Sequence, residues 1–462
     1  MEQGEPEVQN IKFRDNGLPL AGLARNVPRA SIPISFFVAS GFGLIGCSLA
    51  WVWAGKQATI DPTADQVVAA VHLGMLATLS MGVLGALHQF GPVVGRRPLR
   101  STTLAWGTFS TWLGASWLIP IGLASKTEIL VEVGGALASV SLGLVIVNLS
   151  GPLSSKDGGV TVNGLRLSLA GLVCTGCYGV VYVADRRGNW FNLSGHVVLA
   201  HALVGIFGWL GLTYVAVSER LWPMFLLAHV PGNKKLGNLA IWTIALGVLL
   251  ASPGVLLGLL WLSWPGAVLL AVGLGAHSLS LANHIRCSKR PRDIYLMSII
   301  AGEFWLLVGL ALSILAALEI PSNHHTGVAL VAGAIAVFGG WILTVLVGHL
   351  HKVVPFIVWT TLRTRGIKST PDGRPLLFGN LYSKFWSRVT LLSTQVAVGS
   401  LCFGLSCSLA GIVRMAGVFF MISALVTMAN FSLSYLSVVN PPTGTSDGFL
   451  GGSTYTQPSQ GS

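Results

Sequence analysis

Long apolar stretches alternate with short polar connections along the chain from residue 33 to residue 438. Each stretch is about 20 residues long or longer, which is the length that a helix needs to cross the hydrocarbon core of a bilayer. The pattern predicts about twelve transmembrane helices. They are expected near residues 33–55, 66–91, 103–123, 128–150, 162–184, 195–218, 236–262, 265–286, 294–318, 327–360, 387–411 and 413–438.

The composition supports lipid as the solvent for these helices. Of the 462 residues, 52% are hydrophobic and only 10% are charged, whereas a soluble protein has about 25% charged residues. The net charge of +12 is attributed to basic loops near anionic lipid. No basic stretch is interleaved with aromatic residues, so the expected partner is the lipid bilayer and not nucleic acid. We therefore expect an all-α integral membrane protein, placed in the cell inner (plasma) membrane.

The charges of the loops predict the direction of the helices. Loops that follow even-numbered helices are basic, such as GRRPLR after the second and RCSKRPRD after the eighth, and the longest one follows the tenth. Basic loops stay in the cytoplasm. Residues 1–32 are thus expected to form a cytoplasmic N-terminal tail and residues 33–438 the transmembrane domain. Residues 439–462, rich in Gly, Ser, Thr and Pro, are expected to form a disordered cytoplasmic tail.

Three of the predicted helices end in a similar way. The second, sixth and tenth carry Pro92, Pro223 and Pro355, which are 131 and 132 residues apart. Four residues before these prolines stand His88, Glu219 and His351. This spacing predicts three pseudo-repeats of four helices each. The alternative is that each proline only marks a helix end at the membrane surface.

Several histidines fall inside the predicted helices, where ionisable side chains are costly and usually face the bundle interior. Imidazole is a ligand for haem iron, copper and zinc. His349 and His351 are two residues apart, about 200° around a helix, so they would serve different sites. Each histidine could instead hydrogen-bond to a backbone carbonyl. The remaining candidates are His72, His88, His196 and His201, and the carboxylates that could carry protons or have structural roles are Glu132, Glu219 and Glu303.

Twelve helices, four-helix repeats and histidines on helices two, six and ten resemble subunit I of the haem-copper oxidase superfamily, which includes cytochrome oxidases and nitric oxide reductases. In that family, helices two and ten hold a low-spin haem, and a His-x-His motif on helix ten serves two haems. The resemblance implies haem binding by His72 in VHLG and by His349 and His351 in GHLH. Helix six contributes a copper ligand in the family, a position that His196 or His201 could take.

The chain departs from this family in two respects. The family's copper site needs two adjacent histidines around helix seven, and the seventh predicted helix has none, so a standard copper site is not expected. The proline alignment also pairs His88, rather than His72, with the motif of the tenth helix. The resemblance thus implies a divergent, haem-binding member in respiratory electron transfer or nitric oxide or oxygen chemistry. A cytochrome or another redox subunit would be its partner.

Two other interpretations fit the same pattern. A secondary transporter of a small solute would also have twelve helices, with Glu132 or Glu303 carrying protons. Such transporters are commonly built from two six-helix halves with a long central loop, whereas the longest loop here follows the tenth helix. The third interpretation is a cofactor-free membrane subunit of a redox complex.

Overall fold

The computed structural model describes residues 28–439, apart from 62, 157, 189–195, 229, 231–233, 291 and 319–323. The predicted tails therefore lie almost entirely outside the described residues. The described part is helical, and its only pairing of extended backbone is an isolated bridge between Ser369 and Pro375. The expectation of an all-α membrane protein is confirmed.

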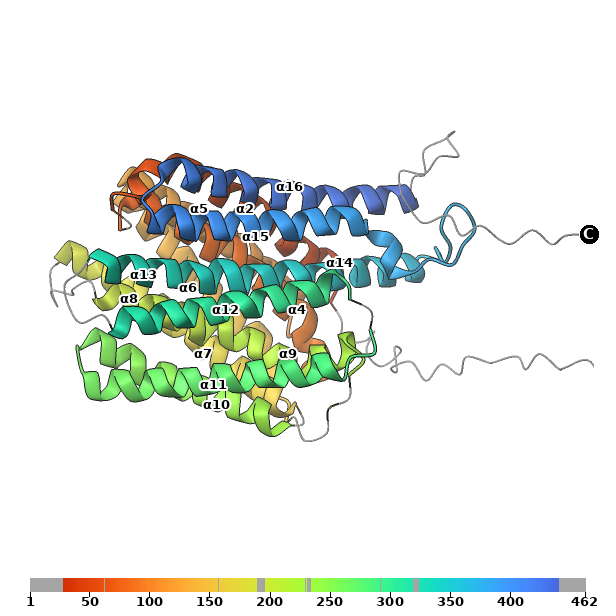
Figure 1. Ribbon diagram of the computed structural model, residues 1–462. Coiled ribbons are helices and arrows are strands. Elements are labelled where there is room, and N and C mark those ends of the chain that lie inside the picture. Colours follow the sequence, from red (N-terminus) through yellow and green to blue (C-terminus); the bar gives the residue numbers. More distant parts are fainter. Residues whose placement is uncertain are drawn as a thin grey trace, which may run out of the picture.

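The helices run nearly parallel and antiparallel in one bundle (Figure 1). Nine α-helices of the described chain are single rods, and their bounds are α2 Ser31–Ala58, α5 Thr102–Ser125, α6 Glu128–Leu153, α7 Gly159–Gly188, α10 Lys234–Leu256, α11 Leu260–Arg286, α12 Ile294–Leu318, α15 Lys384–Ser406 and α16 Ala410–Val439. These bounds agree with the predicted stretches to within a few residues at most ends.

Two predicted boundaries were wrong. The seventh helix was expected to reach residue 262, but α10 ends at Leu256 and α11 begins at Leu260. Gly258 between them has a φ of 68°, a left-handed conformation that glycine adopts without strain. The eleventh helix was expected to reach residue 411, but α15 ends at Ser406 and Ser408 turns the chain with a φ of 54°. Hydropathy cannot detect these turns because apolar residues continue through both of them.

Eleven helices within the described residues are long and apolar enough to span a membrane. The remaining long helix, α5, has 24 residues but is not among the eleven. Its many threonines and serines reduce its hydropathy. Membrane insertion thus follows from length and composition for most of the chain.

Three longer helices contain a π-helical segment. They consist of α3 Asp65–His72, η1 Leu73–Ser80 and α4 Met81–Gly95; of α8 His196–Leu203, η2 Val204–Gly211 and α9 Leu212–Phe225; and of α13 His324–Ile335, η3 Ala336–Leu343 and α14 Thr344–Thr364. We call them the central helices. A π-helix has wider turns, with hydrogen bonds between residues five apart, and such segments are frequent at functional sites. At the end of η1, the N–H of Met81 donates to the carbonyl of Leu76 in this way.

The π-helical segments occupy equivalent places in the three central helices. Each segment has eight residues and begins 19 residues before the proline of its helix, at Leu73, Val204 and Ala336. The segments contact one another: η3 packs on both η1 and η2. Between η1 and η2, Trp209 Nε1 donates a hydrogen bond to Ser80 Oγ over 3.0 Å. The three π-helical segments thus pack against one another.

The same packing contacts recur at every fourth helix. The hairpins α5–α6, α10–α11 and α15–α16 are closely packed, and α2, α7 and α12 pack on the central helix that follows each of them in the chain. The first part of each central helix also contacts the next hairpin, in the pairs α3–α5, α8–α10 and α13–α15. The last helix, α16, packs along α2, so the arrangement closes on itself (Figure 1).

Glycines allow the neighbouring helices to approach the π-helical segments closely. A Cβ atom on Gly43 of α2 would overlap the carbonyl of Ala77 in η1. A Cβ atom on Gly171 of α7 would likewise overlap the carbonyl of Gly208 in η2. Small residues at helix contacts let backbones pack together, which drives helix association where lipid offers no hydrophobic gain.

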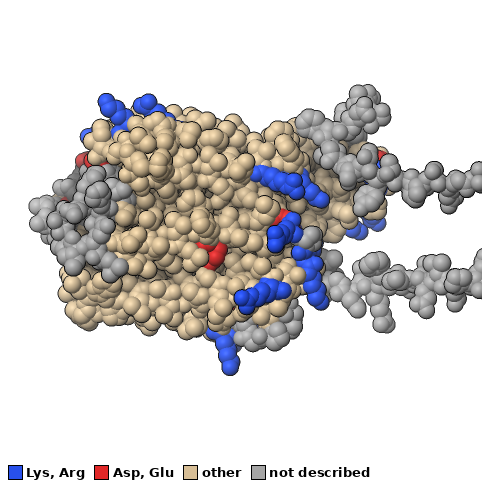
Figure 2. Space-filling view, in the orientation of Figure 1, with Lys and Arg blue, Asp and Glu red and all other residues tan. Residues whose placement is uncertain are grey.

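Most of the Lys and Arg side chains visible in Figure 2 lie toward one end of the bundle. The loops 96–101, 287–293 and 365–383 project from this end. We call it the basic end. Two of the central helices, α3–η1–α4 and α13–η3–α14, both run toward the basic end. Their residues near Pro92 and Pro355 therefore lie in the half of the bundle closer to that end.

The close approach at Gly171 leads to a test. Gly171→Ala should destabilise the protein by about 1–3 kcal/mol, because the new methyl group forces α7 away from η2. Gly275→Ala in α11 is the matched control, since nothing lies within 4 Å of its Cβ position. The control should be neutral or stabilising, as alanine is favoured over glycine inside a helix. Thermal unfolding in detergent measures both; equal stability of the two variants would contradict the tight contact.

Candidate functional site

His72 and His201 form the one ring contact between two histidines in the described part of the chain. His72 ends α3 and His201 lies in α8, so each precedes a π-helical segment. Their ring centroids are 6.4 Å apart and their planes differ by 20°. The Nδ1 atom of His201 is buried without a hydrogen-bond partner. The structure thus places the predicted ligand His72 beside the sixth helix, although the resemblance had implied a partner on the tenth.

Four of the predicted ligands share one local geometry. The Nδ1 atoms of His72, His88, His349 and His351 each lie 2.8 Å from the carbonyl oxygen four residues earlier. A carbonyl can only accept, so Nδ1 carries the proton in each neutral ring and Nε2 keeps its lone pair. This is the tautomer that binds a metal through Nε2. In these four histidines, Nδ1 thus forms the hydrogen bond to a backbone carbonyl that was the alternative to a ligand role. The lone pair of Nε2 is not used by this hydrogen bond.

Two of these Nε2 atoms have no partner. His88 and His351 are both 0% exposed, and their Nε2 atoms are buried without a hydrogen bond. The His88 ring stacks on Phe36 of α2 at 5.2 Å, and the His351 ring lies 4.9 Å from Phe431 of α16. An unsatisfied buried acceptor costs about 1–3 kcal/mol. The two rings contact different helices, so the structure does not bring His88 and His351 together.

In His349, the Nε2 atom has a hydrogen-bond partner. The Nε2 atom of His349 lies 3.4 Å from the hydroxyl of Tyr295, which must be the donor because Nδ1 already holds the proton of the ring. Tyr214 of α9 packs edge-on against the same ring at 5.8 Å. His349 and His351 therefore face different sides of α14, as their spacing predicted.

The carboxylates and His196 occupy separate places. Glu219, the third member of the proline-aligned column, lies against Gly237 of α10. Glu303 of α12 accepts a hydrogen bond from Ser278 of α11, and its other oxygen is buried without a partner. Glu132 is half-buried in α6, and His196 is exposed at the first residue of α8.

A second group of residues, which the sequence did not single out as a site, contacts His349 through Tyr214. Rings of Tyr214, Trp222, His277 and Trp341 contact one another at centroid distances between 4.8 and 6.3 Å. We call these four residues the aromatic cluster. They come from α9, α11 and η3, and each is at most 7% exposed. The regular seven-residue spacing of His277 and His284 was the only sign of this cluster in the sequence.

The aromatic cluster is rich in polar atoms that lack partners. The hydroxyl of Tyr214, both indole N–H groups and both ring nitrogens of His277 are buried without a hydrogen bond. Buried polar atoms are nearly always satisfied by protein or by ordered water. In the aromatic cluster, five such atoms without a partner lie on four rings that contact one another.

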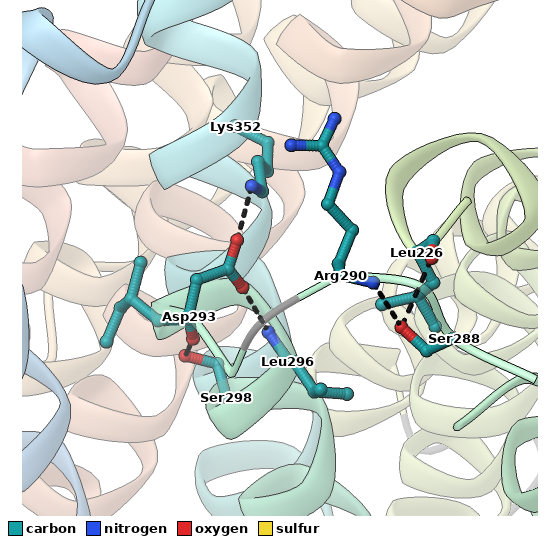
Figure 3. Close-up of polar contacts among 8 residues, drawn as sticks. Leu226, Ser288, Arg290, Asp293, Leu296, Ser298 and Lys352 are labelled. Atoms are coloured by element: carbon teal, nitrogen blue, oxygen red, sulfur yellow. Dashed lines mark hydrogen bonds and ion pairs between the residues drawn. The ribbon is translucent and has the colours of Figure 1, made fainter. Parts of the chain in front are cut away.

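An ion pair connects α14 to the loop before α12. The ammonium group of Lys352, which directly follows His351, lies 2.5 Å from the carboxylate of Asp293 (Figure 3). The Lys352 side chain is only 6% exposed. The other oxygen of Asp293 accepts from the N–H of Leu296 and so stabilises the first turn of α12. Burial and, to a smaller extent, the nearby carboxylate of Asp293 raise the pKa of the Tyr382 hydroxyl.

Two loops at the basic end are joined beside this ion pair. The hydroxyl of Ser288 and the N–H of Lys289 both donate to the carbonyl of Leu226, which follows α9. The same hydroxyl accepts from the N–H of Arg290 (Figure 3). The end of α9 and the helix α14 are thus both connected to the segment between α11 and α12. His349 and His351 lie on α14 just before Lys352.

A small interior cavity lies between helices two and ten. Its volume is about 20 Å³, and its lining includes Gly74, Thr78, Gly339 and Leu343 of the two π-helical segments. Such a volume is enough for about one water molecule. The packing at this point between the two helices therefore leaves room for about one water molecule.

Comparison of the chain with protein-family models gave no match, and comparison with curated proteins gave none either. Within the described residues, no group of three or more His, Cys, Asp or Glu side chains could hold a metal ion. A metal would thus have to be bound by fewer side chains, as an axial pair binds the iron of haem.

The Lys352–Asp293 pair generates a prediction with two arms. Asp293→Ala leaves the buried ammonium unpaired and removes the cap of α12, and we expect a loss of about 3–5 kcal/mol in the free energy of unfolding. Asp293→Asn keeps a side chain that can cap α12 but removes the charge, so its loss should be smaller. The double variant D293N/K352M should recover part of the stability, because the uncompensated charge is gone. Thermal unfolding in detergent is the measurement; no recovery in the double variant would mean that the charge of Lys352 is not the cause.

Proposed function

We propose that this chain is a divergent, haem-binding membrane protein with the architecture of subunit I of the haem-copper oxidases, acting in respiratory electron transfer or in nitric oxide or oxygen chemistry. The observation that carries the proposal is the set of three central helices. They have π-helical segments at equal spacing and imidazoles with a fixed tautomer on the second and tenth helices. A partner cytochrome or other redox subunit would exchange electrons with it.

The proposed architecture has twelve spanning helices in three units of four, with α5 as the twelfth. Three observations favour it over two six-helix halves. The π-helical segments begin 131 and 132 residues apart. The packing contacts recur at every fourth helix, and the hairpin that follows each central helix lies beside its first part. His88, Glu219 and His351 stand at equivalent positions, each four residues before the proline of its helix.

Two sets of imidazoles could hold haem. His72 and His201 are the candidates for an axial pair because their rings are parallel and neighbouring. His88 and His351 are the candidates for single ligands because their Nε2 atoms are unpartnered. Bound haem would supply one-electron chemistry, with the axial ligands and the hydrogen bonds behind them setting its potential. The carbonyls that accept from Nδ1 of His72, His88 and His351 would hold the rings in the ligating tautomer.

The basic end is proposed to face the cytoplasm, since basic loops are retained there. A reporter inserted after Arg100, or within residues 364–386, should then be active as a cytoplasmic fusion. A reporter near Thr59 should be active outside. The two tails, 1–32 and 439–462, would be cytoplasmic. The reverse pattern of reporter activity would reject this orientation.

The haem proposal is tested by the reduced-minus-oxidised absorption spectrum of the purified protein, in which Soret and alpha bands are expected. Loss of an axial ligand should weaken haem retention by more than about tenfold, since even the removal of an outer partner costs 10- to 100-fold. His72→Ala and His351→Ala are the two main variants, and His284→Ala is a buried control outside the candidate set.

The two variants distinguish a haem site before the π-helical segments, at His72 and His201, from one after them, at His88 or His351. Loss of the bands in His72→Ala alone would support the pair with His201. Loss in His351→Ala alone would support a site closer to the basic end. A full haem complement in both variants would show that the ligands are wrongly assigned, and a spectrum without haem bands would reject haem binding.

A proton-coupled transporter is the second candidate. The half-satisfied carboxylate of Glu303 and the polar atoms of the aromatic cluster favour it, because buried ionisable groups mark ion and substrate pathways in membranes. A protein without haem bands that acidifies or alkalinises the lumen of proteoliposomes on addition of a solute would support this candidate. The absence of both signals would favour a cofactor-free subunit of a redox complex.

A further inference from the structure

We propose that a groove between α6 and α7 at the basic end binds an anionic phospholipid. The groove has a volume of about 480 Å³, within the usual range for ligand pockets. Its lining consists of Ile146, Ser150, Leu153, Ser154, Arg166, Leu169, Ala170 and Val173. This site is independent of haem binding and of the transporter interpretation.

One part of the groove is polar and the other is apolar. Ser150, Ser154 and Arg166 lie at the end of α6 and the beginning of α7, where the chain reaches the basic end. Ile146 and Val173 lie farther along the two helices, toward the middle of the bundle. Ile146 is 41% exposed on the outer surface of a helix that the bilayer surrounds. The groove thus has the two-part character of a lipid: an end for a headgroup and a wall for an acyl chain.

Three arginines converge on the polar part. Nη1 of Arg97 donates to Ser154 Oγ over 2.8 Å, and Nε of Arg100 donates to Ser150 Oγ over 2.6 Å. Both arginines come from the loop after α4, so a third segment of the chain contacts the two serines of the groove. Arg97 and Arg100 each use a single N–H group in these hydrogen bonds, which leaves four of the five donors of each guanidinium free.

The third arginine lies in the groove itself. Arg166 donates to the carbonyls of Leu153 and Ser155 and to the side chain of Asn163. The contact with Leu153 caps the last turn of α6, where the helix dipole favours a positive charge. Capping accounts for one edge of the guanidinium, and two of its five donors stay free. A purely structural role would explain Arg166 but not the two arginines that join it from another loop.

No described carboxylate balances the charge of this cluster. Within the part of the chain that the structure describes, none of the three arginines has a carboxylate partner. Arginine binds phosphate through paired N–H groups with high specificity, and basic pockets at the cytoplasmic ends of membrane helices bind anionic headgroups. A free phosphate would use only the polar part, whereas a phospholipid would also cover the apolar wall, so the lipid is the occupant that the groove fits.

The experiment measures lipid binding to the purified full chain by native mass spectrometry, with phosphatidylglycerol against phosphatidylcholine as the probes. The wild type should retain phosphatidylglycerol preferentially. The variant R97Q/R100Q/R166Q should bind it on the order of a hundredfold more weakly, since each basic side chain near an anionic surface contributes about a factor of five. The control R365Q/K368Q/R388Q removes the same charge from exposed positions at the same end and should bind as the wild type does.

A second variant tests the apolar wall without changing any charge. Ala170→Trp places a large side chain in the groove from an exposed position, so it should weaken phosphatidylglycerol binding while the protein stays folded. Glycerol phosphate, which has the headgroup phosphate but no acyl chain, should compete poorly. Equal losses in the control and the triple variant, unchanged binding in Ala170→Trp, or strong competition by glycerol phosphate would each overturn the proposal.

Discussion

The contact between the three π-helical segments is the interaction on which the arrangement of the bundle depends. In lipid, a helix must satisfy its backbone groups internally, and apolar side chains gain little by leaving lipid for protein. Close backbone approach and hydrogen bonds between helices therefore decide which helices meet. The segments meet through glycines, through large buried rings and through the Trp209–Ser80 hydrogen bond. Six of the outer helices pack directly on one of these segments, namely α2, α5, α7, α10, α12 and α15.

The candidate ligands show how one backbone contact sets the chemistry of a side chain. A helix carbonyl four residues earlier fixes the tautomer of His88 and His351, and a neighbouring Phe ring fixes the plane of each imidazole. The unpartnered lone pair on Nε2 is then a consequence of helix geometry and does not require further hydrogen bonds to orient the ring. The ion pair of Lys352 adds a constraint along the helix axis, because it connects the residue after His351 to the start of α12.

The sequence predicted the helices well because hydropathy and length are the very properties that a bilayer selects. The three helices that the proline spacing singled out are the ones that contain π-helical segments. It could not predict the π-helical segments, since a single added residue changes the helical phase without changing hydropathy. The short turns at Gly258 and Ser408 were missed for the same reason.

The partners of the candidate residues could be predicted less well than the helices. The side of α14 on which His351 lies depends on its phase after η3, and the neighbour of His72 depends on how α3 meets α8. Lys352 within an apolar stretch was a visible signal of a buried partner, yet its partner Asp293 lies 59 residues away in another loop. The aromatic cluster is a product of packing between three helices, and tryptophans in apolar stretches are too common to identify it.

The π-helical segments divide each central helix into two parts whose faces are set independently. One residue more in the turn rotates everything after it by about 100° relative to an uninterrupted α-helix. His72 and His201 stand before this rotation, while His88, Glu219 and His351 stand after it. A substitution in one half of a central helix can therefore alter which neighbouring helix a side chain contacts in that half. The side chains of the other half keep their direction. The bundle is in this sense two layers stacked along the membrane normal, each free to acquire its own chemistry.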